Sequence, residues 1–238
     1  MLGSTGVRVR RLVHAALLEQ VPRDHHESDR AFRRRRMVVL GVLVLGSVLL
    51  GISLSARPGD RSFYALTGAL AAVWVLGAFA SGPLHLGRID FRGTLRRPIL
   101  TPIAIGLLAA AVFVLGALVV RQIGPLRDYT ENVLAHARYG SLVLVTVLTV
   151  LNGITEEIFF RGALYAAIGN RRPVLVSTVI YAIATLATGN PMLVFAAATL
   201  GVVLALQRRA SGGVLAPILT HVTWSAAMLF ALPPLFAG

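Results

Sequence analysis

Cysteine is absent from the chain, which excludes disulfides, thiolate chemistry and cysteine-ligated zinc. Charge is also scarce: charged residues make up only 14% of the 238 residues, whereas hydrophobic residues make up 56%. A water-soluble fold of this size needs more polar surface than this composition supplies. The composition therefore predicts that most of the chain lies in a lipid bilayer.

Lysine is absent as well, so arginine alone supplies the positive side of the net charge of +13. These arginines lie between the apolar runs, so the charge indicates membrane topology and not a nucleic-acid partner. Nine of them precede the first apolar run, including the block 33–36, whereas only Arg57 and Arg61 lie in the next connection. The positive-inside rule then predicts a cytoplasmic N-terminus and an external C-terminus. We expect an integral protein of a bacterial cytoplasmic membrane.

Apolar runs recur along the chain, close to the roughly 20 residues that an α-helix needs to cross a bilayer. The predicted fold class is all-α, a polytopic transmembrane helix bundle of about seven spans. The first run is expected to remain as an anchor, because its end at 54–56 lacks the small-x-small pattern of a cleaved signal. The predicted spans are 37–55, 63–81, 98–120, 140–168, 173–188, 191–207 and 213–236.

The chain is expected to have three parts. Residues 1–36 form a basic cytoplasmic segment, in which the amphipathic stretch 7–21 either lies on an anionic membrane surface or belongs to a disordered tail. Residues 37–97 contain two accessory transmembrane helices and a basic loop. Residues 98–238 form the main transmembrane domain. The first three spans carry no charge at membrane depth, so we expect them to face lipid as a supporting shell.

Acidic side chains almost disappear from the second half of the chain. After Glu131 only Glu156 and Glu157 occur, adjacent to each other inside an apolar run. An ionisable group at membrane depth costs a few kcal/mol, so it marks a functional site or a specific partner. Arg161 follows Glu157 at i+4, the spacing that predicts a pair on one helix face. Glu156 is turned about 100° away, which leaves its carboxylate freer to act as a base.

Histidine is equally scarce, because His221 in the last run is the only one after His136. A rise of about 1.5 Å per residue gives His221 and Glu156 similar depths if the helix bends after Arg161. A carboxylate and an imidazole that converge in the inner leaflet would form a polar cavity suited to activating water or stabilising an oxyanion. The alternative is a buried hydrogen-bonded network that only fixes helix packing.

Three segments of the second half resemble the motifs of a known family. Residues 155–162 read T-E-E-I-F-F-R-G and are similar to its E-E-x-x-x-R-G motif. Residues 216–221 read A-P-I-L-T-H and resemble the start of its last motif, H-x-x-x-N, while 177–185 occupy the place of its F-x-x-x-H helix. The family is that of the CAAX-prenyl-protease and bacteriocin-processing intramembrane proteases, also called the Abi domain. The resemblance covers about residues 98–236.

The resemblance implies an intramembrane endopeptidase that uses a glutamate to activate water. Carried over to this chain, Glu156 is the base, Glu157 and Arg161 support it, and His221 donates a hydrogen bond to the oxyanion. These four residues are the predicted catalytic set. The expected partners are a membrane-associated peptide or protein substrate and the bilayer itself.

Two positions depart from the family's motifs. Thr185 stands where the middle motif has histidine, and Ser225 stands where the last motif has asparagine. We assign Tyr181, Thr185 and Ser225 to binding. Serine can still donate a hydrogen bond, but threonine cannot replace histidine as a base or as a neutral metal ligand. Zinc is suggested by the family's naming but is not supported by the residues present, so no metal ligand is predicted.

Three hypotheses follow from these residues. The leading one is a weakened intramembrane endopeptidase that cleaves at the cytoplasmic side, with Glu156, Thr185 and His221 around one inner-leaflet cavity. The second is a non-catalytic scaffold or peptide-binding protein of the same fold, which the departures at Thr185 and Ser225 favour. The third is a transporter with a carboxylate proton relay, which fits the buried charge but not the order of the motifs.

Overall fold

The structure, a computed structural model, describes residues 10, 13–21, 27–91 and 93–237. The predicted basic segment and its amphipathic stretch therefore lie only partly within the described residues. The elements are α2 (Asp29–Ser55), α3 (Arg61–Ser81), β1 (Ile89–Phe91), β2 (Thr94–Arg96), α4 (Leu100–Val120), α5 (Gly124–Tyr139), α6 (Leu142–Glu157), η1 (Ile158–Leu164), α7 (Tyr165–Ile168), α8 (Pro173–Thr185), η2 (Leu186–Thr188), α9 (Pro191–Ser211) and α10 (Leu215–Leu235).

The all-α polytopic bundle predicted from the sequence is confirmed, but the count of spans is lower. Six helices in the described chain are long and apolar enough to cross a membrane. The predicted fifth span is present with the predicted bounds as a shorter apolar helix, Pro173–Thr188, in which the last turn tightens into η2 and Gly189 follows. At about 1.5 Å per residue it extends about 24 Å, less than the roughly 30 Å of a hydrocarbon core.

Side-chain caps fix where several helices begin. The hydroxyl of Ser28 accepts a hydrogen bond from the Ala31 amide, so α2 starts eight residues before the predicted span and includes the arginine block 33–36. Asp60 caps α3 in the same way, and Asn190 caps α9. Such caps satisfy amide groups that have no partner inside the helix.

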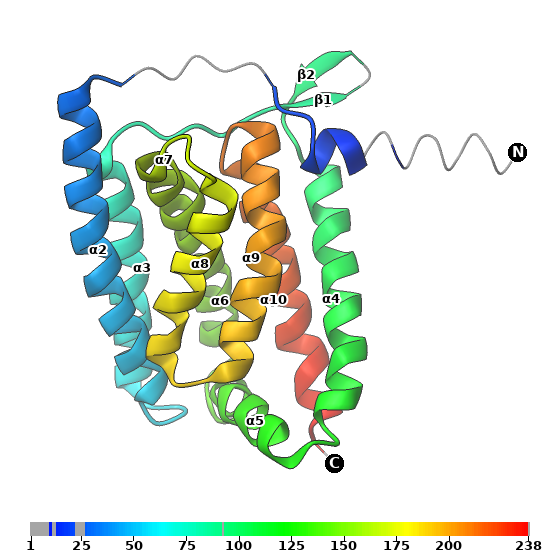
Figure 1. Ribbon diagram of the computed structural model, residues 1–238. Coiled ribbons are helices and arrows are strands. Elements are labelled where there is room, and N and C mark those ends of the chain that lie inside the picture. The colour runs from blue at the N-terminus through cyan, green and yellow to red at the C-terminus, as the bar shows by residue number, and fades with distance from the viewer. Residues whose placement is uncertain (1–9, 11–12, 22–26, 92, 238) are drawn as a thin grey trace, which may run out of the picture.

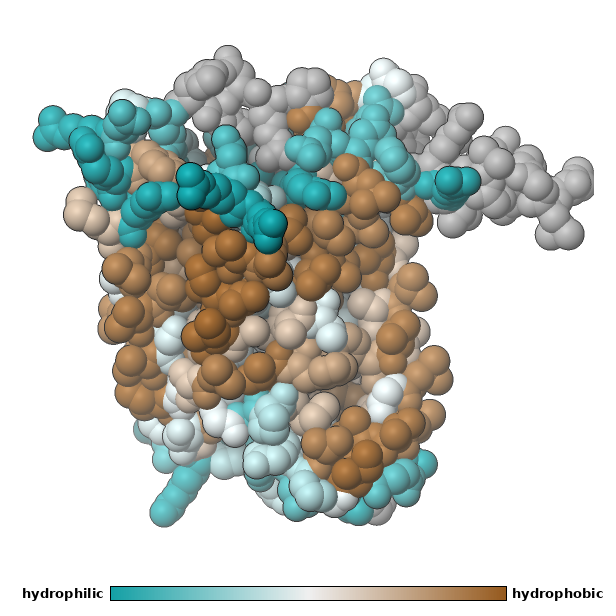
Figure 2. All heavy atoms as spheres, in the orientation of Figure 1, coloured by the Kyte–Doolittle hydropathy of each residue, from teal (hydrophilic) through white to brown (hydrophobic). Residues whose placement is uncertain are grey.

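The helices stand side by side, with α5 lying across one end of the bundle (Figure 1). α2 packs against α3, α4 against α10, and α8 against α9. On the face shown in Figure 2, a broad apolar belt lies between two polar ends. Exposed side chains such as Leu40, Leu76 and Val143 belong to this belt, at 64%, 69% and 72% exposure. Large apolar groups exposed to this extent indicate contact with lipid, so the chain is an integral membrane protein.

The arginine-rich connections gather at the end of the bundle opposite α5. The start of α2, the segment between α3 and α4, the α7–α8 connection and the end of α9 all lie at this end (Figure 1). We call it the arginine-rich end and the opposite one the α5 end. Fewer arginines, among them Arg57, Arg61 and Arg138, lie at the α5 end. The predicted topology would place the arginine-rich end in the cytoplasm.

The first two spans face lipid on one side, as expected, but their other side packs into the core of the bundle, which the sequence analysis did not predict. Trp74 of α3 is 0% exposed, and its ring stacks on Phe159 at 4.5 Å between centroids. Phe160 lies 5.2 Å from the same ring, and Val39 of α2 belongs to the same core cluster. The core-packed side was missed because the absence of charge does not distinguish a lipid-facing helix surface from one packed in an apolar core.

Gly46 allows α2 to approach Trp74, because a Cβ at this position would overlap the indole ring. We predict that Gly46→Ala destabilises the fold by about 1–3 kcal/mol, the usual cost of overpacking a core. Gly41→Ala is the matched control on the same helix, since a Cβ there meets nothing within 4 Å. Thermal unfolding in detergent should show a lower midpoint for Gly46→Ala alone. Equal midpoints for the two variants would contradict this account of α2–α3 packing.

Candidate active site

A π-helical segment follows the two glutamates. α6 ends at Glu157, η1 continues as Ile158–Leu164, and α7 completes the helix to Ile168. A π-helical turn contains more residues than an α-helical turn, and such turns are frequent at functional sites. The segment carries Arg161, and its side chain contacts Glu157 one turn back.

Glu157 lies in a buried cluster of charged and polar groups. Its Oε1 accepts a hydrogen bond from Nη1 of Arg161 at 2.8 Å and one from Nδ1 of His221 at 2.8 Å. Glu157 and Arg161 are both 0% exposed. The pair expected from the i+4 spacing is therefore present. The contact between His221 and Glu157 was not predicted, because the sequence analysis expected His221 to lie beside Glu156.

Arg161 connects this cluster to two further helices. Its Nη2 donates a hydrogen bond to the carbonyl oxygen of Gly201 in α9 at 3.2 Å. Its guanidinium lies over the Tyr181 ring of α8, 4.6 Å from the centroid. A Cβ at position 201 would lie 3.2 Å from Nη2 of Arg161, so glycine permits this close approach. The buried pair thus joins α6 and η1 to α8, α9 and α10.

Glu156 has different surroundings from its neighbour. The hydroxyl of Tyr181 donates a hydrogen bond to its Oε2 at 2.7 Å. Glu156 also lines a cavity of about 270 Å³, to which neither Glu157 nor Arg161 contributes. A carboxylate that borders open space and accepts a hydrogen bond from a neutral hydroxyl can also contact a water molecule or substrate.

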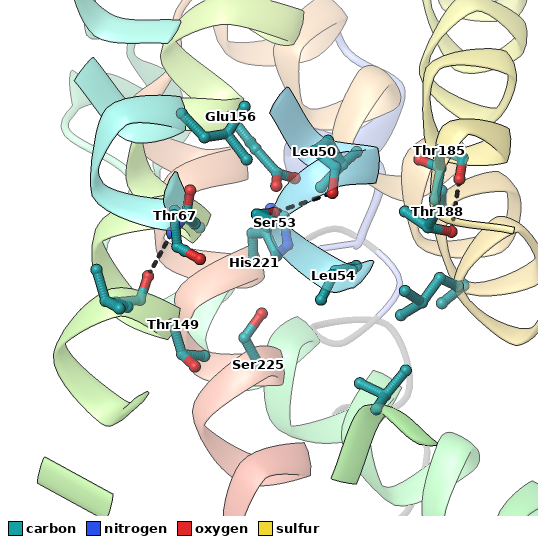
Figure 3. A pocket seen from close by; sticks show the side chains of 18 of the residues that line it. Leu50, Ser53, Leu54, Thr67, Thr149, Glu156, Thr185, Thr188, His221 and Ser225 are labelled. Atoms are coloured by element: carbon teal, nitrogen blue, oxygen red, sulfur yellow. Dashed lines mark hydrogen bonds between the residues drawn. The ribbon is translucent and has the colours of Figure 1, made fainter. Parts of the chain in front are cut away.

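The cavity brings five of the seven predicted site residues to one space: Glu156, Tyr181, Thr185, His221 and Ser225. Figure 3 shows Glu156 and His221 near each other, with Ser225 and Thr149 farther along the cavity. Most of the remaining lining is apolar, from α2, α3, α6 and α9. A small polar group of side chains thus lies at one end of a largely apolar cavity.

The cavity extends toward the α5 end. Leu54 in the last turn of α2, Phe63 in the first turn of α3 and Leu193 in the first turn of α9 all line it, as does Val133 of α5. A cytoplasmic N-terminus, which the arginines favour, would make this cavity reach toward the outer leaflet and not toward the predicted inner leaflet, so the leaflet stays a prediction. Depth counted along helices locates a side chain, but it does not show in which direction the space around that side chain opens.

Residues 138–227 match the family model Rce1-like, described as type II CAAX prenyl endopeptidase Rce1-like. This segment, called the Rce1-like segment below, is similar to that family. The match confirms the resemblance predicted from the motifs, and the segment contains α6 to α9 and the first part of α10. At family level it supports an intramembrane endopeptidase of the CAAX-protease type. Neither the curated proteins nor the solved structures gave a match to the chain.

Thr185 and Ser225, the two departures in the Rce1-like segment, both line the cavity. The Thr185 hydroxyl donates a hydrogen bond to the carbonyl oxygen of Tyr181 at 2.8 Å within α8. In Figure 3 Thr185 lies beside Thr188 and apart from Glu156 and His221. The side chain that reaches Glu156 from α8 is therefore Tyr181, one helical turn before Thr185.

The sequence analysis missed the part that three residues of the Rce1-like segment play in the candidate active site. Tyr181 was assigned to binding, although its hydroxyl contacts Glu156 directly. Asn152 lies one turn before Glu156 on the cavity wall, and its buried Oδ1 has no hydrogen-bond partner within the described chain. Trp224 lines the cavity with a buried indole N–H that likewise lacks one there. A lone amide in an apolar run, spaced i+4 from a glutamate, was the available signal for Asn152.

The residues of the Rce1-like segment do not fit a zinc site. Across the described part of the chain, no three His, Asp or Glu side chains are placed to hold one ion. Oε1 of Glu157 is already shared by Arg161 and His221, and Nδ1 of His221 contacts this oxygen. A carboxylate that neutralises a buried guanidinium is a poor ligand for a second cation. We therefore derive no step through a metal.

The different surroundings of the two glutamates predict different effects on stability. Glu157→Gln leaves Arg161 charged and unpaired in a buried site, which typically costs about 3–5 kcal/mol. Glu156→Gln is the matched control, because it makes the same change on the adjacent residue without unpairing a buried charge. Thermal unfolding in detergent should show the larger loss for Glu157→Gln. A loss of similar size in the two variants would rule out this division between the two carboxylates.

Proposed function

We propose that this chain is an intramembrane endopeptidase that hydrolyses a peptide bond of a membrane-associated peptide, with Glu156 as the general base. The observation that carries the proposal is the asymmetry of the two adjacent glutamates. Glu157 is buried and held by Arg161 and His221, whereas Glu156 lines the cavity. The match of residues 138–227 to the Rce1-like family supports the same class of reaction.

In the proposed reaction a water molecule in the cavity attacks the carbonyl carbon of the substrate. The carboxylate of Glu156 accepts a proton from this water while the new carbon–oxygen bond forms. The tetrahedral intermediate then collapses, the carbon–nitrogen bond breaks, and protonated Glu156 returns the proton to the leaving amine. The immediate products are a carboxylic acid and an amine, and Glu156 regains its starting charge. A proton then passes from the acid to the amine, which gives a carboxylate and an ammonium group.

His221 and Ser225 are the candidate donors to the oxyanion. Nδ1 of His221 donates to Glu157, so Nε2 is the ring nitrogen left for the cavity. With Nδ1 bound to Glu157, a protonated ring presents an N–H at Nε2 to the cavity, and the Ser225 hydroxyl offers a second hydrogen bond from the same helix.

The hydroxyl of Tyr181 is proposed to position Glu156. It donates a hydrogen bond to Oε2, which leaves Oε1 of this carboxylate for the water. The Tyr181 ring is held between Phe160, at 4.6 Å between centroids, and the guanidinium of Arg161. The phenol is therefore fixed by the same buried pair that neutralises Glu157.

The substrate is proposed to be an apolar peptide that approaches from the bilayer. The cavity is lined mainly by apolar side chains and lies inside the lipid-facing belt. With the N-terminus proposed to be cytoplasmic, the cavity reaches toward the outer leaflet, so cleavage is proposed on the side of the α5 end. Nucleic acid is not a proposed partner, because the arginines lie at the polar end of a membrane-embedded bundle.

The reaction can be tested with purified protein in vesicles and a library of apolar membrane peptides. We predict slow hydrolysis by the wild type and a loss of about 10²- to 10⁴-fold in Glu156→Gln, the usual worth of a general base. Glu131→Gln is the matched control, because this glutamate makes a partly exposed i+4 pair with Arg127 on α5, away from the cavity, and should tolerate the change. Equal rates in the wild type and Glu156→Gln would contradict the proposed role.

The same assay tests the alternative of a non-catalytic scaffold, which Thr185 and Ser225 favour. In an enzyme, Thr185→His combined with Ser225→Asn should raise the rate by supplying the histidine and the asparagine that the family's motifs have at these two positions. A general base or an oxyanion donor typically raises the reaction rate by about 10²-fold or more. The gain should disappear when Glu156→Gln is added. A folded double variant that is as inert as the wild type would support the scaffold instead.

A further inference from the structure

A second cavity, of about 730 Å³, lies at the arginine-rich end of the bundle. It is bounded by the first turns of α2, the segment that follows α3, the stretch from η1 to the α7–α8 connection, and the end of α9. Phe160 lines the first cavity and Gly162 lines the second, so the π-helical segment separates the two. The second cavity has no part in the proposed hydrolysis, and we call it the arginine cavity.

The lining of the arginine cavity is strongly cationic. Arg35, Arg36, Arg171 and Arg208 contribute to it, and Glu27 is its one acidic side chain among the described residues. Four positive charges against one negative charge leave three positive charges on the lining. A site with this excess is suited to a ligand that carries negative charge.

Two of these arginines are buried, unlike arginines that serve only to set topology from exposed loops. Arg35 is 1% exposed and Arg208 is 6% exposed. Arg35 is held by Glu27 and by the Ser81 hydroxyl, the latter at 3.3 Å. Nε of Arg208 donates to the carbonyl oxygen of Arg161 at 2.6 Å. Burial of two guanidinium groups beside one cavity requires compensation, which a bound anion would add.

The other two arginines lie at the rim, where they can donate to a ligand. Nε of Arg36 donates to the carbonyl oxygen of Ala167 at 3.0 Å, and its guanidinium lies over the Phe32 ring at 4.4 Å. These contacts fix the guanidinium, and its two Nη groups make no hydrogen bond within the described residues, so they can donate to a ligand. Arg171 is exposed in the α7–α8 connection. A planar guanidinium can donate two parallel hydrogen bonds to a phosphate.

The position of the cavity favours a lipid as the source of that phosphate. The polar end at which it lies borders the apolar belt, at the level expected for lipid headgroups (Figure 2). Its lining also contains Phe32, Leu84 and Ile168, which can contact the apolar part of a lipid. Basic pockets between transmembrane helices bind anionic headgroups. We propose that the arginine cavity binds the phosphate of an anionic membrane lipid.

The test measures thermal unfolding in a neutral detergent with added phosphatidylglycerol, phosphatidylcholine or inorganic phosphate. The cavity variant is Arg36→Gln with Arg171→Gln. Its matched control is Arg33→Gln with Arg172→Gln, which removes the same charge from exposed positions on the same two segments outside the lining. A ligand that binds the folded state raises the midpoint with its concentration. Phosphatidylglycerol should raise it for the wild type and the control, whereas the cavity variant should need about tenfold more lipid.

Other results would overturn the proposal. Equal shifts from phosphatidylglycerol and phosphatidylcholine would exclude selection for an anionic headgroup. Equal responses of the cavity variant and its control would assign the effect to general surface charge. A full shift from inorganic phosphate alone, lost in the cavity variant, would show a site for a free anion and overturn the lipid source. If the double variant fails to fold, Arg171→Gln against Arg172→Gln, both exposed, gives the same comparison.

Discussion

The buried contact between Glu157 and Arg161 is the interaction on which the rest of the site depends. A carboxylate and a guanidinium with 0% exposure are tolerated only if hydrogen bonds satisfy what the pair itself does not. His221 supplies one from α10, and the carbonyl oxygen of Gly201 in α9 accepts another. The Tyr181 ring of α8 covers the guanidinium. Four segments are therefore oriented by one pair of charges, and a substitution that unpairs them should disturb all four.

The same pair explains how two adjacent glutamates acquire different roles. Consecutive helical side chains point about 100° apart, so Glu157 facing the buried cluster turns Glu156 toward another surface. That surface is the apolar cavity, where the Tyr181 hydroxyl holds one of its carboxylate oxygens. In the proposed enzyme, Glu157 contributes structure and charge balance, and Glu156 contributes the proton transfer. The Rce1-like match of residues 138–227 agrees with this reaction class and leaves the activity of this chain to experiment.

Local patterns predicted much of this arrangement, and tertiary packing determined the rest. The Glu157–Arg161 pair follows from i+4 spacing on one helix, and composition alone predicts an apolar helical bundle. The hydrogen bond from Tyr181 to Glu156 joins residues 25 positions apart, so it depends on how α8 is rotated against α6. The contact of His221 with Glu157, the burial of Trp74 and the direction of the cavity depend on similar rotations. The predicted fifth span has the bounds that the sequence indicated, and it differs from the other six only in being a shorter apolar helix.

The most direct test of the central claim is whether water reaches Glu156 but not Glu157. Protein in vesicles, permeable to reagents from both sides, can be treated with a water-soluble carbodiimide and an amine, and the modified carboxylates located by tandem mass spectrometry. Asp60 and Glu131, outside the spans, act as internal positive controls. The account predicts modification of Glu156 and protection of Glu157. Modification of Glu157 with protection of Glu156, or protection of both, would contradict it.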